Sequence, residues 1–374
     1  LYRPDSTRTV FQADRFLCTT AYVIDCQYRR IDLTLSLGVE QMPSEPKVVI
    51  IGTGGTIAGR ADSATNLAYS AGQLSIEDLL EVIPDLANVA QISGQNLFSL
   101  NSKDMGPAQW QLLARTISEE VSRKDVSGVV ITHGTDTLEE AALFLHLTLR
   151  TDKPIVLTGS MRPATALSPD GPANLFHAVQ VCASAKASGR GVLVVMNGEI
   201  LPALHLVKRH SIATNAFTSS PAGPLGRVYS GRTSFFSGPT KVALAGAFGI
   251  ALANDMTLPA VDIHYVAAGS SHAGLLSCDW TERNGLVIAG FGSGEIPDGL
   301  VPEINRLADE GITIVVSSRV AGVVVLPETM TLTEGHHIVA SRHLNPHKSA
   351  LLLSLTLAAG KDVAATFIRT DADG

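Results

Sequence analysis

The stretch that most constrains the fold of this chain is residues 48–59, with the sequence VVIIGTGGTIAG. Its leading apolar residues, 48–51, predict a short buried strand. A glycine-rich turn follows directly and carries two hydroxyl side chains, Thr53 and Thr56. Because open α/β sheets bind ligands at the carboxyl ends of their strands, this turn is a candidate ligand loop. The alternative is an ordinary tight turn with two incidental threonines.

Short apolar strands alternate with helices after this turn. Strands are expected at 129–132, 155–158 and 192–196, with helices near 75–84, from 107, at 138–149 and at 173–184. This alternation predicts a parallel sheet with helices on both faces.

A zone rich in Gly, Ser and Pro, residues 219–259, interrupts the alternation, and a smaller α/β unit starts at residue 261. Its expected strands are 261–265, 286–289 and 312–316, and its expected helices are 273–281, 300–309 and 346–359. We therefore predict an N-terminal extension (1–45), an N-terminal α/β catalytic domain (46–238), a linker (239–259) and a smaller C-terminal α/β domain (260–374).

Composition narrows the function classes. The chain has 374 residues, of which 45% are hydrophobic and 17% charged, and this is enough apolar content for two folded domains. The net charge of −7 argues against nucleic-acid binding. The longest run of apolar residues and glycine, 242–253, is too short to cross a membrane. The first residues lack the ordered parts of a signal peptide, which favours the cytoplasm; a periplasmic or secreted protein is the alternative.

Common cofactor and metal motifs are absent from the sequence. Ile57 stands where a dinucleotide-binding loop needs its third glycine, and no P-loop, H-E-x-x-H, G-x-S-x-G or C-x-x-C motif occurs. The histidines of the C-terminal region match no common ligand spacing, and we expect them to be solvated loop residues: His336, His337, His343 and His347. No metal and no organic cofactor is therefore expected.

A second strand–turn–helix stretch, residues 129–139 (VVITHGTDTLE), places Thr135 beside Asp136. Helix capping explains one of these residues, but it does not explain a second loop that again presents a hydroxyl group. Loops from neighbouring parallel strands would face each other at the switch point of the sheet. Lys208 follows the strand ending near residue 196; if it is desolvated beside Thr135 it becomes a candidate proton acceptor, and otherwise it is a surface charge.

Stretches spread over residues 46–374 resemble the bacterial L-asparaginases of the type II, periplasmic class. The stretches that carry the resemblance include GTGGTIAG (52–59), DSATNLAYSAG (62–72), SKDM (102–105), ITHGTDTLEE (131–140), KPIVLTGSMRP (153–163), SPDGPANL (168–175) and VASRHLNPHKSALLL (339–353). The resemblance implies hydrolysis of L-asparagine to L-aspartate and ammonia through a threonine acyl-enzyme, with L-glutamine as a secondary substrate. It also implies a homotetramer, a dimer of dimers, that works without a cofactor.

Carried over position by position, the resemblance assigns roles to individual residues. Thr56 is the implied nucleophile, and Tyr69 is the implied mobile-loop tyrosine that hydrogen-bonds it. The second catalytic cluster is Thr135, Asp136 and Lys208, with Lys208 as base or proton relay through Thr135. The implied substrate-binding residues are Ser102, Lys103, Asp136, Ser160 and Glu328, the last from a neighbouring subunit. Backbone N–H groups of the glycine-rich loop are candidates for stabilising the oxyanion.

Two positions of the first domain depart from the family pattern, and the family's intersubunit Asn has no clear counterpart near residues 268–270. Lys103 stands where these enzymes commonly carry Gln or Glu near the substrate's α-amino group, and Leu204 replaces an Arg that often precedes the catalytic lysine. A cation at residue 103 would repel the substrate's ammonium group unless it turns toward an acid. Two alternatives therefore stay open: an amidase of the same scaffold with a different acyl specificity, and a catalytically silent ligand-binding homologue.

Overall fold

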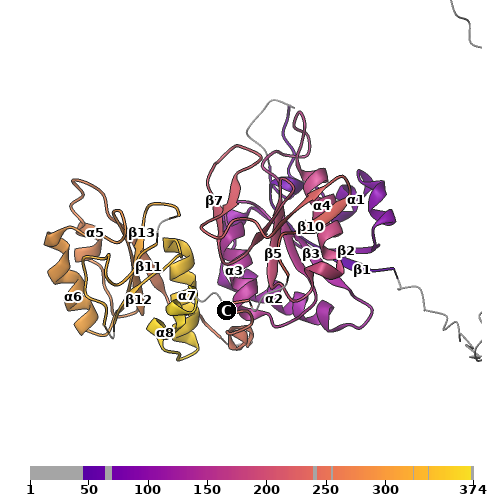
Figure 1. Cartoon of the computed structure of the whole chain (residues 1–374). Coiled ribbons are helices and arrows are strands. Elements are labelled where there is room, and N and C mark those ends of the chain that lie inside the picture. The colour runs from indigo at the N-terminus through magenta and orange to yellow at the C-terminus, as the bar shows by residue number, and fades with distance from the viewer. Residues whose placement is uncertain are drawn as a thin grey trace, which may run out of the picture. The chain divides into compact units, whose positions relative to one another are not determined.

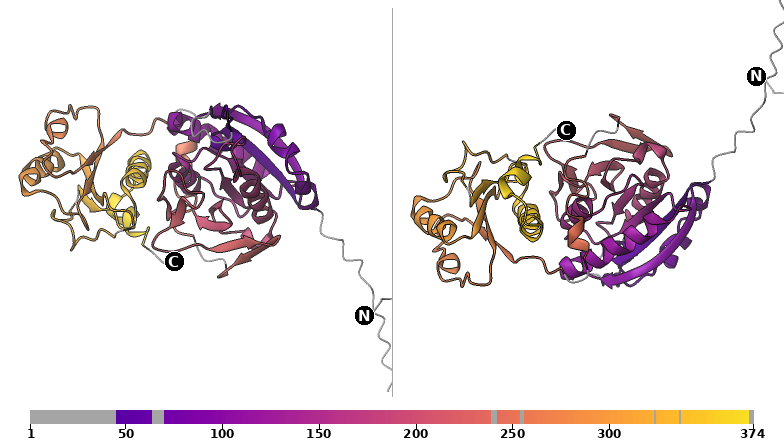
Figure 2. Two further views of the ribbon diagram at one scale, coloured as in Figure 1. Left: turned by 90° about the horizontal axis from the view of Figure 1, so that it is seen from above. Right: turned by 90° about the horizontal axis from the view of Figure 1, so that it is seen from below.

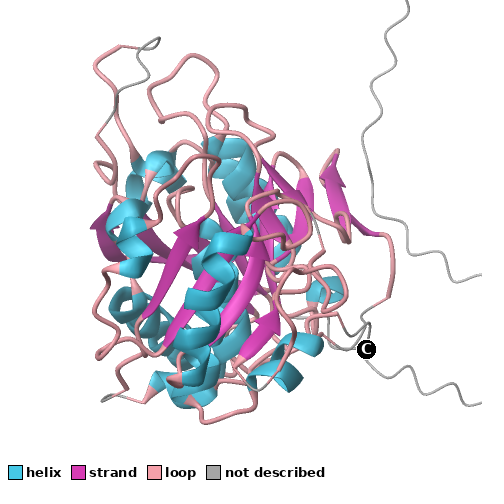
Figure 3. Cartoon of the chain, turned by 90° about the vertical axis from the view of Figure 1, so that its left-hand side faces the viewer, coloured by secondary structure: helices cyan, strands magenta, loops and turns pink. Residues whose placement is uncertain are grey.

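A computed structural model describes residues 45–63, 70–238, 242–253, 256–322, 324–335 and 337–371 (Figure 1). All but the last residue of the expected N-terminal extension lies outside these ranges. The described chain is mixed α/β, with a large mostly parallel sheet and a separate small parallel sheet, which confirms the predicted fold class. In both sheets helices lie against the strands, and loops join them beyond the strand ends (Figure 3).

The large sheet has the strand order β10-β9-β6-β5-β4-β3-β1-β2. Its strands are β1 (Lys47–Gly54), β2 (Gln91–Leu100), β3 (Gly128–Thr132), β4 (Ile155–Thr158), β5 (Val192–Met196), β6 (Glu199–Pro202), β9 (Gly226–Tyr229) and β10 (Arg232–Phe235). Strands β1 to β5 are parallel, and β6, β9 and β10 add an antiparallel edge. The order 2-1-3-4-5 reverses direction at β1 and β3, so that a ligand is expected at their carboxyl ends.

Strand β1 is buried on both faces, as the apolar run predicts. Val49 and Ile51 belong to the hydrophobic cluster on one face, and Val48 and Ile50 belong to the cluster on the other. This alternation is the period of two expected for a central strand. The strand therefore holds the glycine-rich turn rigidly at its carboxyl end.

Helices cover both faces of the large sheet. The α-helices are α1 (Ile76–Glu81), α2 (Pro107–Ser122), α3 (Leu138–Thr148) and α4 (Gly171–Cys182), and the short 3₁₀ helices are η1 (Thr56–Ala58), η2 (Pro84–Asn88), η3 (Ser102–Asp104), η4 (Ala185–Ala187) and η5 (Gly249–Leu252). Ser75 is the N-cap of α1 and forms a capping box with Asp78, at the start of the helix expected near residues 75–84. Residues of α2 and α3 join one core cluster and residues of α1 and α4 join the other.

The small sheet has the order β11-β12-β13-β14, with all strands parallel. Its elements are β11 (Val261–Tyr265), α5 (Ala273–Leu276), β12 (Gly285–Gly290), η6 (Asp298–Leu300), α6 (Val301–Asp309), β13 (Thr313–Ser318), β14 (Ile338–Ala340), α7 (Pro346–Ala358) and α8 (Val363–Ile368). Helices α6 and α7 cover opposite faces of this sheet (Figure 2). Helix α7 also contacts α3, so it connects the small sheet to the helices α2 and α3 that cover one face of the large sheet.

The sequence pattern missed the polar and antiparallel strands. Strand β2 alternates exposed and half-buried residues at the edge of the sheet, so no apolar run marks it. The sequence pattern also did not predict the two-stranded sheet of β7 (Leu206–Lys208) and β8 (Phe217–Ser219). Within the zone expected to be a linker, Leu244, Phe248 and Ala251 are buried in the main core cluster. Among the described residues, no helix has both the length and the apolar character to span a bilayer.

Candidate active site

The two loops singled out in the sequence touch at the switch point of the large sheet. Strands β1 and β3 are direct neighbours, with Gly52 opposite Thr132. Beyond them, a Cβ atom placed on Gly55 would lie 2.4 Å from the Cα of Gly134. Only two glycines allow so close a contact, and Gly55 also has a φ of 80°. Each of these glycines directly precedes a candidate hydroxyl residue, Thr56 or Thr135.

Thr56 begins the short helix η1 and is 4% exposed. Thr53, the other hydroxyl residue of the turn, is 1% exposed and donates a hydrogen bond of 2.9 Å to the carbonyl oxygen of Thr132. Thr53 therefore ties β1 to β3, which is a structural role. Of the two threonines, Thr56 is the one placed beyond the strand end, where the loops meet.

Thr135, Asp136 and Lys208 form the second cluster. Lys208 Nζ donates hydrogen bonds to Thr135 Oγ1 (3.0 Å) and to Asp136 Oδ1 (2.9 Å). The Thr135 side chain is buried, and the side chain of Lys208 is only 18% exposed. A hydroxyl group has one donor and two acceptor positions, so the Thr135 O–H keeps its own proton available for a further acceptor.

Helix capping does not account for Thr135 or Asp136. The N-cap of α3 is Thr137, and its side chain makes no capping hydrogen bond. Instead Thr137 Oγ1 donates to the carbonyl oxygen of Ser102 at 2.8 Å, and the backbone N–H of Asp136 donates to Ser102 Oγ at 3.2 Å. Ser102 is 2% exposed and packs against Gly134. The loop after β2 thus joins the loops after β1 and β3.

The glycine-rich loop offers fewer free amides than the sequence implies. The N–H of Gly55 donates to the carbonyl oxygen of Leu100 at 3.0 Å, and the N–H of Gly59 donates to that of Thr56 at 2.9 Å. These two amides hold the loop in shape and are not available to an oxyanion. Any oxyanion donor in this loop has to come from other atoms.

The other site residues predicted from the sequence range from fully buried to exposed. Ser160 is fully buried, and its hydroxyl group donates to the carbonyl oxygen of Arg162 at 2.7 Å. Lys103 Nζ lies 3.0 Å from Asp104 Oδ1, and the Lys103 side chain is 65% exposed. Glu328 is exposed in a turn after β13, and its role toward a neighbouring subunit stays a prediction. Tyr69 lies outside the described residues; on either side of its segment, Arg60 and Ser70 pair through backbone hydrogen bonds.

Beneath the second cluster lies His133, a residue that the sequence did not single out. Its ring is fully buried, and Nδ1 is 2.7 Å from the carbonyl oxygen of Gly134. Burial lowers the pKa of His133 to about 4, although the bond to Gly134 opposes the shift. The imidazole is therefore neutral at pH 7, with Nδ1 donating to the carbonyl group.

Sequence reasoning also missed Glu139. This residue lies in the first turn of α3 and is 5% exposed. Its Oε1 accepts the backbone N–H of Lys208 at 2.6 Å, and its Oε2 accepts Asn345 Nδ2 at 2.9 Å. No sequence spacing connects residues 139, 208 and 345, so only the folded chain reveals the contact.

The prediction of solvated loop histidines is wrong for His347. It lies in the first turn of α7, with Nε2 at 3.1 Å from Glu139 Oε2. Burial opposes its protonation, but the hydrogen bond with Glu139 and the charges of Glu139 and Glu140 raise the pKa of His347. Among the described residues, no group of three or more His, Cys, Asp or Glu side chains is arranged to hold a metal ion.

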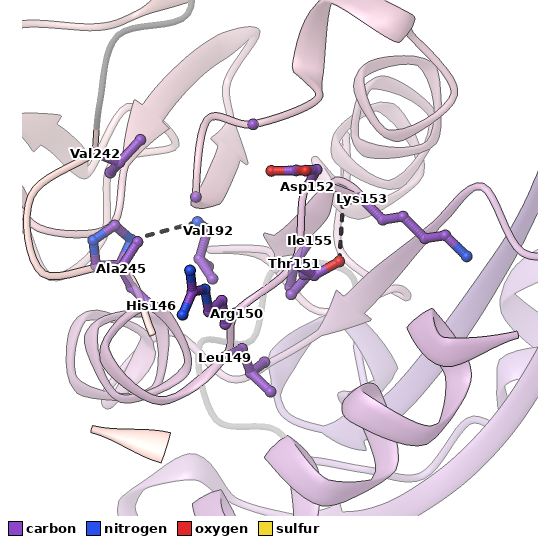
Figure 4. A pocket seen from close by; sticks show the side chains of 12 residues that line it. His146, Leu149, Arg150, Thr151, Asp152, Lys153, Ile155, Val192, Val242 and Ala245 are labelled. Carbon is purple, nitrogen blue, oxygen red and sulfur yellow. Dashed lines mark hydrogen bonds between the residues drawn. The ribbon is translucent and has the colours of Figure 1, made fainter. Parts of the chain in front are cut away.

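A cavity of about 510 Å³ lies at the other end of the large sheet (Figure 4). Its lining includes Arg150, Asp152 and Ile155 before and at the start of β4, and Val192 at the start of β5. The amino ends of parallel strands are not where such sheets place their chemistry. This cavity is therefore separate from the site built by Thr56, Thr135 and Lys208.

Comparison with known families agrees with this architecture. The profile "Asparaginase, N-terminal" matches residues 47–241, and the profile "Glutaminase/Asparaginase C-terminal domain" matches residues 260–366. This chain belongs to the asparaginase family. The predicted family is thereby confirmed.

Several asparaginase relatives align over most of the chain. A probable periplasmic L-asparaginase of Haemophilus influenzae is 38% identical, covering 88% of this chain and 93% of the relative. A glutaminase-asparaginase of Pseudomonas fluorescens biotype A is 39% identical, covering 87% and 90%. The crystal structure of a probable cytoplasmic L-asparaginase from Campylobacter jejuni matches with a TM-score of 0.79 and 35% identity, covering 87% of this chain and 100% of that one.

Proposed function

We propose that this chain hydrolyses L-asparagine to L-aspartate and ammonia with Thr56 as its nucleophile. Family membership and relatives named L-asparaginase support the hydrolysis of asparagine. The observation that carries the assignment of residues is the contact between Gly55 and Gly134. It brings the loop of Thr56 against the loop of Thr135 and Asp136, to which Lys208 Nζ is hydrogen-bonded.

The proposed reaction has two steps. Thr56 Oγ1 attacks the side-chain amide carbon, the hydroxyl proton passes through the relay to the amide nitrogen, the C–N bond breaks, and ammonia leaves as the acyl-enzyme forms. Water then attacks the ester carbon and releases aspartate. A threonine hydroxyl group is a weak nucleophile and needs a neighbouring relay for its proton. Lys208 and Thr135 supply that relay, since Lys208 Nζ and Thr135 Oγ1 are 3.0 Å apart.

Substrate recognition in this proposal uses Ser102, Asp136, Lys103 and Ser160. The exposed carboxylate of Asp136 suits the α-ammonium group of asparagine, because opposite charges attract at close range. Lys103 pairs with Asp104, so its charge turns toward an acid and the repulsion expected from the sequence is reduced. Tyr69 and, from a neighbouring subunit, Glu328 complete the proposed site, and L-glutamine is the proposed secondary substrate.

The proposal includes a homotetramer, the cytoplasm as the compartment, and the four-part division of the chain at residues 45, 238 and 259. The named relatives comprise both periplasmic and cytoplasmic proteins. Sedimentation equilibrium tests the assembly, and mass spectrometry of the native N-terminus tests processing and compartment.

Ammonia release from L-asparagine by the purified protein and by a Thr56→Ala variant is the deciding experiment. We expect turnover by the parent and a loss of at least about a thousandfold in the variant, as is typical when a covalent nucleophile is removed. Equal rates would remove Thr56 from the mechanism. Binding of asparagine without release of ammonia by the parent would instead indicate a silent homologue.

A further inference from the structure

A buried lysine of the small α/β unit reaches the segment that carries Lys208. Lys348, in the first turn of α7, is 1% exposed. Its Nζ donates to the carbonyl oxygens of Ala203 (3.0 Å), Leu204 (3.0 Å) and Leu206 (2.5 Å). An ammonium group has three protons to donate, so these bonds use its full donor capacity. Its three acceptors lie in the few residues just before Lys208.

Glu139 holds the same segment at Lys208 itself. The backbone N–H of Lys208 donates to Glu139 Oε1, while Asn345 Nδ2 and His347 Nε2 contact Glu139 Oε2. Glu139 lies three residues after Asp136, on the helix that directly follows the second catalytic turn. One carboxylate thus links the turn of Thr135 and Asp136, the backbone of Lys208, and the start of α7.

The charges of Lys348 and Glu139 are buried close to each other, and they stabilise this arrangement. Burial lowers the pKa of Lys348 to about 8, while Glu139 and Glu140 oppose that shift. Burial opposes ionisation of Glu139, but His347 and Lys348 outweigh it and lower the pKa of that carboxyl group. A buried charge is tolerated only when its hydrogen bonds are made and opposite charge lies nearby. Lys348 meets this requirement through three carbonyl oxygens, and Glu139 meets it through Asn345, His347 and the backbone N–H of Lys208.

We propose that Lys348 and Glu139 are positioning residues for the catalytic Lys208. Neither residue is assigned a contact with substrate; they hold the backbone at Lys208 and just before it, so that Nζ stays within reach of Thr135 Oγ1 and Asp136 Oδ1. A proton relay loses efficiency when its atoms move by about 1 Å. The inference rests on the proposed function of Lys208.

The test compares Lys348→Met, Lys348→Arg and Glu139→Gln with the parent in the full-length protein. We expect Lys348→Met and Glu139→Gln to lower kcat for asparagine at least about tenfold while the Kd for L-aspartate changes less than about twofold. Lys348→Arg keeps a cation with several donors and should recover part of kcat. Lys361→Met is the matched control, because Lys361 Nζ also donates to a backbone carbonyl group, that of Ala247, away from Lys208; its kcat should equal that of the parent.

The outcomes separate the inference from the proposed function. If folded Lys348→Met and Glu139→Gln both keep the parent kcat, or if kcat and aspartate affinity fall together, the positioning role is wrong. Should Lys348→Met fail to fold, the isosteric Glu139→Gln decides by the same criteria. A Lys208→Met variant with parental turnover would overturn the proposed role of Lys208 itself, whereas an inactive Lys208→Met beside fully active Lys348→Met and Glu139→Gln would overturn only this inference.

Discussion

Gly55 and Gly134 are in contact through their backbones, and this contact joins the two loops of the site. A Cβ on Gly55 would lie 2.4 Å from the Cα and 2.5 Å from the N of Gly134. No side chain can be inserted there without separating the loops. The distance between the Thr56 loop and the Thr135 loop is therefore set by main-chain contact, which is less adjustable than contact between side chains.

Replacing Gly55 by alanine tests this contact. Gly55→Ala should lower the free energy of unfolding by more than about 2 kcal/mol and reduce turnover at least about a hundredfold, because it adds both a strained φ and a clash with backbone. Gly189→Ala is the matched control: Gly189 has a φ of 70° but nothing within 4 Å of its Cβ position. It should lose only about 1 kcal/mol and keep its turnover. Equal effects of the two substitutions in urea denaturation and ammonia release would refute the role of the contact.

The second cluster is tested with Thr135→Val and Lys208→Met. Each should lower kcat by about a hundredfold to ten-thousandfold, since general acid–base groups contribute on that scale. The folded structure should survive, as judged by circular dichroism. Lys47→Met is the control. Lys47 Nζ also pairs with a carboxylate, that of Asp125 at 2.7 Å, but it lies at the surface, so this variant should leave kcat unchanged. Retained turnover in both cluster variants would make the cluster structural.

Lys103 should affect substrate choice only when its partner is lost. Asp104→Asn frees the Lys103 ammonium group, and we expect the KM for asparagine to rise several-fold while the KM for succinamate, which lacks the α-ammonium group, is unchanged. The double variant with Lys103→Gln should restore the parental KM. Parallel changes for both substrates, measured by ammonia release, would show that residue 103 does not sense the α-amino group.

Mixing two inactive variants tests the contribution of a neighbouring subunit. If Glu328 completes the site of another chain, Thr56→Ala and Glu328→Ala subunits refolded together should regain activity in about a quarter of the sites, because mixed pairs contain one intact site. A mixture of Thr56→Ala with Lys208→Met is the control and should stay inactive, since both lesions affect a chain's own site. No recovery in the first mixture would place Glu328 outside the site.

Burial of His133 predicts a loss of stability in mild acid. Its pKa is depressed in the folded state, from 6.5 to about 4, so the unfolded chain binds more protons between these values. Stability should therefore fall by about 3 kcal/mol as the pH is lowered through this window, at 1.36 kcal/mol per pKa unit. A His133→Asn variant should show a flatter dependence in urea denaturation at fixed protein concentration. Part of the slope should remain, because burial also lowers the pKa of His146; an unchanged slope would contradict the assignment.

The sequence by itself determined the local features of this protein. The apolar run at residues 48–51, the helix that starts near residue 75 and the strand–turn–helix at residues 129–139 depend on neighbours along the chain, and they fold as their patterns predict. Resemblance to asparaginases then supplied the family, which the comparisons confirm, and the proposed roles of Thr56, Thr135 and Lys208. Strand β2 could not be predicted from the sequence, because a strand at the edge of a sheet needs no continuous apolar pattern.

Only the tertiary structure shows which residues, distant in the sequence, hold the backbone segment that carries Lys208. Glu139, Lys208 and Lys348 lie far apart in the sequence, and no periodicity links them, yet one carboxylate and one ammonium group hold the same short segment. The pairing of Lys103 with Asp104 and the contact of His347 with Glu139 were likewise open in the sequence. The physical reason is that burial changes what a charge requires: a lysine in an apolar helix must find every one of its hydrogen bonds, and only the folded chain shows where they are.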